Sequence, residues 1–159
     1  MSVVRTAAVV LLGVAGAAMA AAGPVMAVQG WKARTEIRLE LRGQSITFPG
    51  EGPAVRQGAP VLTGPQARAY AEVIGRNVLA ATGGRSYAEV SAELFAAGEE
   101  DEKLSGLRQT AFMGQMLRAS LLNAYQAWQV TTLVIGLGAL LTTTGAALLT
   151  TSATLATTA

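Results

Sequence analysis

Residues 80–91, AATGGRSYAEVS, combine two glycines, a cation and hydroxyl groups, as do loops that cradle phosphate. A phosphate loop of the Walker type needs Gly-Lys-Ser/Thr after an earlier glycine, and it follows a strand. Here the glycines follow a helical pattern, and no lysine is in place. Gly83 and Gly84 instead suit the left-handed end of a helix. Ser86 and Glu89 fit a capping box that starts another helix, which predicts a joint between two helices.

Four consecutive acids, Glu99, Glu100, Asp101 and Glu102, form a second candidate site because carboxylates bind calcium. An EF-hand, however, needs alternating ligands over twelve residues with a glycine at the turn. Acidic residues also favour the positively polarised start of a helix, and we expect a helix start here. Carboxylate-only binding of calcium or magnesium stays open, although no acids in the sequence have the required spacing.

The chain contains no histidine and no cysteine. Facial-triad iron sites need two histidines, zinc sites draw on His and Cys, and nucleophilic triads usually need a histidine base. A hydrolase with two carboxylates would need them at a set separation, which a sequence does not show. We expect a protein that is not an enzyme and that has no cofactor and no metal site.

Two long apolar runs lie near the ends of the chain. Residues 7–28 hold 22 positions without a charge, and residues 130–149 hold another 20. A helix of about 20 apolar residues crosses a hydrocarbon layer of roughly 30 Å and satisfies its own backbone there. The sequence therefore predicts a mainly α membrane protein, with two transmembrane helices flanking a small α-helical domain.

Every charged residue except Arg5 lies between those runs, including 11 of the 12 Lys and Arg and all 10 Asp and Glu. This near balance argues against a nucleic-acid partner, which requires a strongly basic face. The N-terminus also resembles a signal peptide, with Ala18-Met19-Ala20 or Val25-Met26-Ala27 as small-residue cleavage sites. Because the apolar run is long for a signal peptide, we expect an uncleaved anchor.

Two spans place both termini on one side of the membrane. A signal-like start favours termini in the cytoplasm, whereas the positive-inside rule favours the opposite orientation. The opposite orientation is favoured because four cations follow the first span: Lys32, Arg34, Arg38 and Arg42. We expect a two-pass membrane protein with an extracytoplasmic middle domain.

Ile37, Leu39 and Leu41 alternate with charged residues, which is the period-2 pattern of a half-buried strand. We therefore expect a short strand or hairpin near residues 35–48. From Lys103 a helical pattern then runs without proline to Leu149. The expected domains are an N-terminal anchor (1–30), a strand-like and irregular connection (31–64), a helical extramembrane domain (65–127), a C-terminal transmembrane helix (128–150) and a tail (151–159).

Both predicted spans carry a face of small residues, which lets helix backbones approach closely. The first span holds Gly13, Gly16 and Ala20, and the second holds Gly136, Gly138, Ala139, Thr143, Gly145 and Ala146. Two interpretations stay open: the spans pack on each other, or a face remains for a partner's helix. Neither span contains an ionisable residue, so no ion path is indicated.

Five residues near the spans are candidates for the membrane interface. Trp31, Tyr125 and Trp128 flank the spans as an aromatic belt does. Arg118 and Asn123 lie one to three helical turns before the second span. Their expected role is contact with lipid headgroups or capping of the middle domain.

Three segments together resemble a group of small two-span actinobacterial membrane proteins, mostly of uncharacterised function. The segments are Gly64-Pro65, residues 80–89 (AATGGRSYAE), and Gly114-Gln115-Met116-Leu117-Arg118 continuing through residues 121–125 (LLNAY) to Trp128. The resemblance covers roughly residues 60–135 and implies the two-span topology and a bacterial envelope setting. Some members are named after aromatic-ring-opening dioxygenases, but this chain has no histidine to hold iron, and the resemblance supplies no catalytic residues.

These features favour a non-catalytic accessory or assembly subunit of a larger inner-membrane complex. Its expected partners are membrane lipids and other integral membrane proteins. The alternative is an extracytoplasmic ligand-binding or sensing module, which would need a pocket in the middle domain. A membrane-anchored hydrolase is a third possibility and would need a clustered pair of acids.

Overall fold

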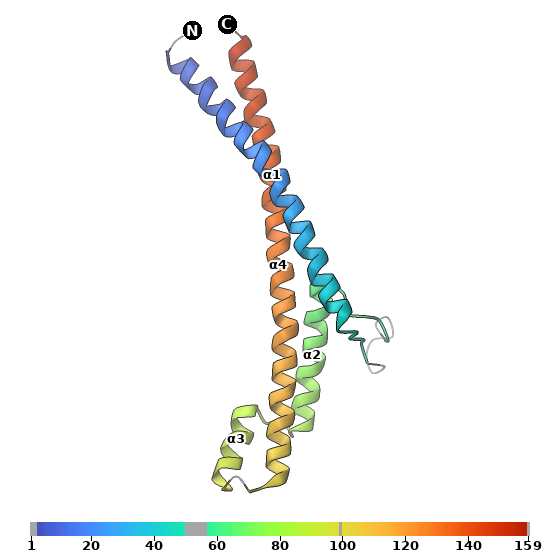
Figure 1. Cartoon of the computed structure of the whole chain (residues 1–159). Coiled ribbons are helices and arrows are strands. Elements are labelled where there is room, and N and C mark those ends of the chain that lie inside the picture. The colour runs from blue at the N-terminus through green and yellow to red at the C-terminus, as the bar shows by residue number, and fades with distance from the viewer. Residues whose placement is uncertain (1–2, 50–56, 99, 159) are drawn as a thin grey trace. The chain divides into compact units, whose positions relative to one another are not determined.

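The computed structural model describes residues 3–49, 57–98 and 100–158. Most of them lie in four helices, α1 (Val3–Gly43), α2 (Gly64–Ala81), α3 (Tyr87–Ala96) and α4 (Glu102–Thr157), so the mainly α prediction is confirmed (Figure 1). The chain folds into two compact units. We call the first, Met1–Glu36 with Gln129–Ala159, the helix pair, and the second, Ile37–Trp128, the middle domain.

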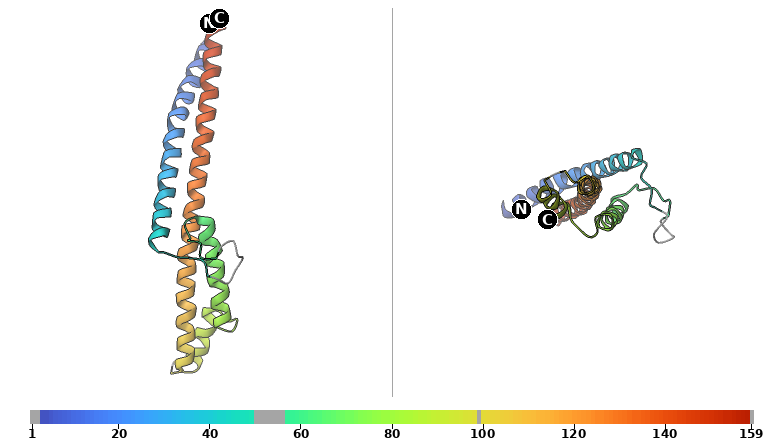
Figure 2. Two further views of the ribbon diagram at one scale, coloured as in Figure 1. Left: turned by 90° about the vertical axis from the view of Figure 1, so that its right-hand side faces the viewer. Right: turned by 90° about the horizontal axis from the view of Figure 1, so that it is seen from below.

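In the helix pair, α1 and α4 run antiparallel and side by side, so the start of α1 and the end of α4 lie at the same end of the pair (Figures 1 and 2). α1 has 41 residues and α4 has 56, and each contains an 18-residue window that is apolar enough to cross a membrane. Only 11% of each window is buried within the protein. Most of this apolar surface therefore faces away from the chain itself.

The middle domain brings α2 and α3 together with the adjoining parts of α1 and α4. Small residues allow α2 to approach α4: Ala67 and Ala71 are fully buried, and a side chain on Gly114 would collide with Val78. Leu121 of α4 lies in the same core as these alanines. The buried core cluster consists of Leu41, Phe48, Val61, Ala67, Ala71 and Leu121.

The strand or hairpin predicted near residues 35–48 is wrong, because α1 continues as a helix to Gly43. Ile37 and Leu41 are four residues apart, so they share one helix face as well as one strand face. Leu41 is 3% exposed whereas Leu39 is 58% exposed, as a helix requires and a strand does not. In the described part of the chain, β-type backbone pairing is limited to one isolated antiparallel bridge between Thr47 and Pro60. Residues 50–56 of the predicted connection lie outside the described residues.

The long helix predicted from Lys103 is confirmed, since α4 runs without a break from Glu102 to Thr157. The predicted helix start at the acidic cluster is also confirmed. The Asp101 carboxylate accepts hydrogen bonds from the backbone N–H groups of Lys103 (2.9 Å) and Leu104 (3.0 Å). The helix includes residues 151–157, which the sequence analysis assigned to a tail.

The contrast between Leu39 and Leu41 provides a test of the helix. Leu41→Ala should lower the free energy of unfolding by about 2–5 kcal/mol, because it leaves a cavity in the core. Leu39→Ala should change it by less than about 0.5 kcal/mol, as exposed substitutions usually do. Denaturant unfolding of the full chain in mild detergent, followed by circular dichroism, measures both. Equal losses would indicate a strand, in which the two side chains share a face.

Candidate functional site

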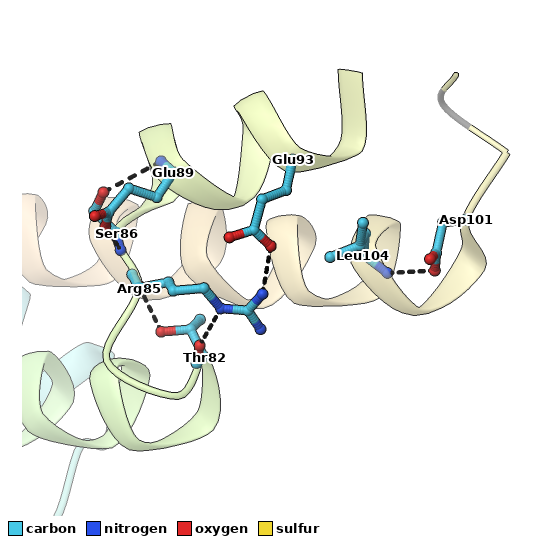
Figure 3. A network of polar contacts seen from close by, with 7 residues as sticks. All are labelled: Thr82, Arg85, Ser86, Glu89, Glu93, Asp101 and Leu104. Atoms are coloured by element: carbon cyan, nitrogen blue, oxygen red, sulfur yellow. Dashed lines mark hydrogen bonds and ion pairs between the residues drawn. The ribbon is translucent and has the colours of Figure 1, made fainter. Parts of the chain in front are cut away.

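The glycine-rich loop at residues 82–86 is a joint between α2 and α3, as predicted. Gly83 and Gly84 have φ angles of 66° and 82°, in the left-handed region that glycine adopts without strain. Ser86 caps α3 through a complete capping box with Glu89. The Ser86 N–H donates to the Glu89 carboxylate (2.7 Å), and the Glu89 N–H donates to the Ser86 hydroxyl (3.3 Å) (Figure 3).

The one cation of this loop, Arg85, is engaged within the fold. Its Nε donates to the Thr82 carbonyl (2.8 Å), and its guanidinium pairs with the Glu93 carboxylate (2.5 Å) (Figure 3). Thr82 is fully buried, and its hydroxyl donates to the Arg85 carbonyl (2.6 Å). The polar groups that suggested a phosphate loop therefore hold the joint together instead.

The contact between the two helices of the helix pair repeats every seven residues. On α1 the buried positions are Gly16, Gly23 and Gly30, and on α4 they are Thr131, Gly138, Gly145 and Ser152. Gly16 faces Gly145, Gly23 faces Gly138 and Gly30 faces Thr131, which is the register of an antiparallel pair. A strict seven-residue repeat winds helices around each other with a left-handed supercoil.

The backbones of this pair are in direct contact. A Cβ atom on Gly145 would lie 2.7 Å from the Gly16 carbonyl oxygen, and one on Gly138 would lie 2.6 Å from the Gly23 carbonyl oxygen. Both distances are too short for real side chains, so only glycine fits at these positions without a shift of the backbone. Such close approach is how helices associate where no hydrophobic force drives them together.

Polar contacts between α1 and α4 occur at both ends of the pair. At one end, Arg5 donates from Nε to the Leu155 carbonyl (2.9 Å). At the other end, Arg34 donates to the hydroxyls of Thr131 (3.2 Å) and Thr132 (2.6 Å). The pair is therefore held by arginine hydrogen bonds at its ends and by glycine contacts between them.

The structure divides the small residues predicted from the sequence into two sets. Gly16, Ala20 and Gly138 lie in the α1–α4 contact, and Gly13 lies beside it, where a Cβ atom would be 3.2 Å from the Ser152 hydroxyl. Gly145 also lies in the contact. The remaining four, Gly136, Ala139, Thr143 and Ala146, are exposed on another face of α4. A Cβ atom on Gly136 would meet nothing within 4 Å. Both open interpretations therefore have a structural counterpart: the helices pack on each other, and a small-residue face remains uncovered.

Sequence reasoning missed four residues of the contact: Gly23, Gly30, Thr131 and Ser152. The Ser152 hydroxyl donates to the Val9 carbonyl (2.8 Å) and so joins the helices directly. The seven-residue spacing along each helix was the signal that could have identified these residues.

The predicted interfacial residues belong to different units. Trp31 lies in the helix pair, 57% exposed, with the Arg34 guanidinium 5.5 Å from its ring centroid. Tyr125 and Trp128 belong to the middle domain. Asn123 is exposed, in agreement with a surface role.

Trp128 and Tyr125 each contact an arginine in the middle domain. The guanidinium of Arg38 lies 6.0 Å from the Trp128 ring centroid, and a side chain on Gly64 would collide with Trp128. The guanidinium of Arg68 lies 5.3 Å from the Tyr125 ring centroid and donates to its hydroxyl (3.2 Å).

Arg118 lines a cavity of about 320 Å³ between α2 and α4 of the middle domain. Its side chain lies across the open position of Gly75, where a Cβ atom would be 3.4 Å from the Arg118 Nε. Arg68, at the same cavity, pairs with Glu72 (3.4 Å), and the Tyr125 hydroxyl raises the pKa of Arg68. The cavity is lined by Arg68, Ala71, Glu72, Arg118, Leu122, Tyr125 and Gln126.

An apolar stripe lies exposed on α4 in the middle domain. We call Phe112, Met113, Met116 and Leu117 the methionine stripe; each is between 45% and 55% exposed. These residues recur at the spacing of one helix face. Phe112 also packs against Tyr87 of α3, with ring centroids 6.0 Å apart.

Among the described residues, no three Asp or Glu side chains gather as a metal site would require. Comparison of the chain with protein-family models, with curated proteins and with solved structures finds no match.

The close contact of the helix pair predicts different effects at two neighbouring glycines. Gly138→Leu should separate the helices, because the new side chain would meet the backbone of α1, whereas Gly136→Leu should not. The chain has no cysteine of its own, so one can be introduced on each helix by Gly13→Cys and Ser152→Cys. A disulfide between these two cysteines then measures how closely the helices approach. We expect disulfide formation in membranes to slow at least about tenfold with Gly138→Leu, a barrier change of roughly 1.4 kcal/mol, and to be unchanged with Gly136→Leu. Similar rates for both variants would contradict the glycine register.

The capping box predicts a pH-dependent contribution to the stability of α3. The hydrogen bond from the Ser86 backbone N–H lowers the pKa of Glu89, and the Ser86 side chain adds to this effect. The cap therefore stabilises α3 above the unfolded pKa of Glu89, which is about 4.3, and this contribution is lost as the pH falls through the lower folded pKa. Glu89→Gln should destabilise α3 at pH 7, with the difference from wild type disappearing once the pH is below the folded pKa of Glu89.

Hydrogen exchange of α3 amides, corrected for intrinsic rates, measures this difference, with Glu100→Gln as a control that removes an exposed acid. Ser86→Ala should cost about 1 kcal/mol in the same experiment. An effect of Glu89→Gln that stays equal from pH 7 to below the folded pKa of Glu89 would exclude the carboxylate charge as the cause.

Proposed function

We propose that the chain is a two-pass membrane protein that acts as a non-catalytic accessory or assembly subunit of a larger bacterial inner-membrane complex. The middle domain is proposed to lie on the extracytoplasmic side, as the signal-like N-terminus favours. Membrane lipids and other integral membrane proteins are the proposed partners.

The dimensions of the helix pair support membrane insertion. Arg5 and Arg34 are 29 residues apart on α1, which corresponds to about 44 Å at roughly 1.5 Å per residue. A bilayer with its headgroup regions is about 40–45 Å thick. The two arginines are therefore spaced to reach the two polar interfaces, with only uncharged residues on α1 between Arg5 and Lys32.

The observation that carries the subunit proposal is the methionine stripe. It lies on a part of α4 that also holds Lys103, Arg108 and Arg118, so lipid is not expected to cover it. Exposed apolar patches of this kind mark protein interaction sites. Methionine side chains are flexible and polarisable, which suits them to contact with another protein.

The residue types of the chain support a role in binding over a role in catalysis. Histidine and cysteine, which serve as base, nucleophile or metal ligand in many enzymes, do not occur in the sequence. The charged groups at the α2–α3 joint contact each other. The cavity of the middle domain supports the alternative, a ligand-binding or sensing module, and its chemistry is developed below.

The test is purification of the tagged full chain from the membranes of its own host in mild detergent, with quantitative mass spectrometry. We expect one set of membrane proteins to co-purify at a fixed ratio. Met116→Glu should reduce their recovery at least about tenfold, or roughly 1.4 kcal/mol of binding free energy, because it places a charge in the apolar contact. Gln115→Glu adds the same charge at the adjacent exposed position and should leave recovery unchanged.

Recovery of the wild-type chain alone, or the same recovery for both variants, would overturn the proposal. Circular dichroism of both variants establishes that neither change unfolds the domain. If the chain emerges alone, ligand screening of the middle domain tests the sensing alternative.

A further inference from the structure

We propose that the cavity between α2 and α4 binds the phosphate group of a small phosphate ester, with Arg118 as the principal contact. This inference concerns a ligand site in the middle domain and does not depend on the subunit proposal. The ester is either soluble or the headgroup of an anionic phospholipid, and the phosphate is the chemistry that these sources share.

The charge of the cavity is the first argument. Arg68 is paired with Glu72 on the same helix, so these two charges offset each other. Arg118 is half-buried, and no carboxylate within the described residues pairs with it. Removing a cation from water without an anion is unfavourable. The cavity therefore has an excess of positive charge, which an anionic group on a ligand would balance.

The placement of Arg118 is the second argument. Its side chain lies against Gly75 of α2, where a Cβ atom would already be in van der Waals contact with the arginine and a larger side chain would meet it. Its guanidinium is a planar fork of N–H donors that matches the oxygen atoms of phosphate. Gln126 and Tyr125 also line the cavity and carry hydrogen-bonding groups, of which the Tyr125 hydroxyl accepts from Arg68.

The size and remaining lining of the cavity limit the ligand. Its volume of about 320 Å³ is at the lower end of the range for small-molecule sites, roughly 300–1,000 Å³. Ala71 and Leu122 give it an apolar part beside the charged groups. A phosphate with a short alcohol substituent, such as glycerol, fits this combination of volume and lining.

The experiment uses the full chain in neutral detergent with chloride as the only small anion. The soluble arm measures binding of glycerol phosphate and inorganic phosphate by calorimetry. The lipid arm uses native mass spectrometry to detect phospholipid retained from nanodiscs that contain either phosphatidylglycerol or phosphatidylcholine. Binding in the first arm identifies a soluble ester, and selective retention of phosphatidylglycerol identifies a headgroup.

Arg118→Gln should weaken whichever binding is found at least about tenfold, or roughly 1.4 kcal/mol. Arg108→Gln removes the same charge from an exposed position of the same helix and should leave binding unchanged. Gly75→Leu should weaken binding as Arg118→Gln does, because it displaces the Arg118 side chain without a change in net charge. Met116→Glu should leave binding unchanged, which separates this site from the methionine stripe.

Two results would overturn the proposal: no binding by the wild-type chain in either arm, or equal losses with Arg118→Gln and Arg108→Gln. Arg118→Lys covers the case in which Arg118→Gln fails to fold. It keeps the charge and loses the planar fork, so binding should fall while the helical content stays unchanged. Full binding by Arg118→Lys and by Gly75→Leu would also contradict the assignment.

Discussion

The contact between the backbones of α1 and α4 is the constraint on which the helix pair depends. Two helices shield only a narrow strip of each other, and here that strip consists mainly of glycine. In the proposed membrane setting, burial of apolar side chains between helices gains little, so van der Waals contact and hydrogen bonds would hold the pair. A larger residue at Gly138 or Gly145 would remove the contact itself. The seven-residue repeat is therefore a requirement of the arrangement.

The same constraint explains where the polar groups of the helix pair lie. In the middle of the pair, the Thr142 hydroxyl donates to the Gly138 carbonyl of its own helix (2.8 Å), whereas the Ser152 hydroxyl, closer to one end, donates to the Val9 carbonyl of α1. Arginines occur only near the ends, where Arg5 and Arg34 each join α1 to α4. An arginine in the centre would need both a partner and water. The glycine contact leaves room for neither.

The parts of the fold that depend on local chemistry could be predicted from the sequence. The joint at Gly83 and Gly84 follows from neighbouring residues alone, because the capping box is satisfied within four positions. The strand prediction failed because Ile37 and Leu41 fit a strand and a helix equally well, and only packing in the core decides between them. Gly136 and Gly138 are the same residue type two positions apart. Which of them faces α1 depends on a register that neither helix specifies by itself.

Long-range packing also determines which polar groups are available for binding. Arg85 was the cation that first suggested a phosphate site. Its guanidinium, however, donates to the Thr82 carbonyl in the joint and pairs with the Glu93 carboxylate of α3. Arg118 gave only a weak signal in the sequence, and its side chain lies against Gly75, which is 43 positions away on another helix. The local pattern at residues 80–91 correctly predicted a helix joint, but it could not show which arginine lines a cavity. A cation that the fold does not neutralise is the better candidate, because its desolvation is offset only when an anion arrives.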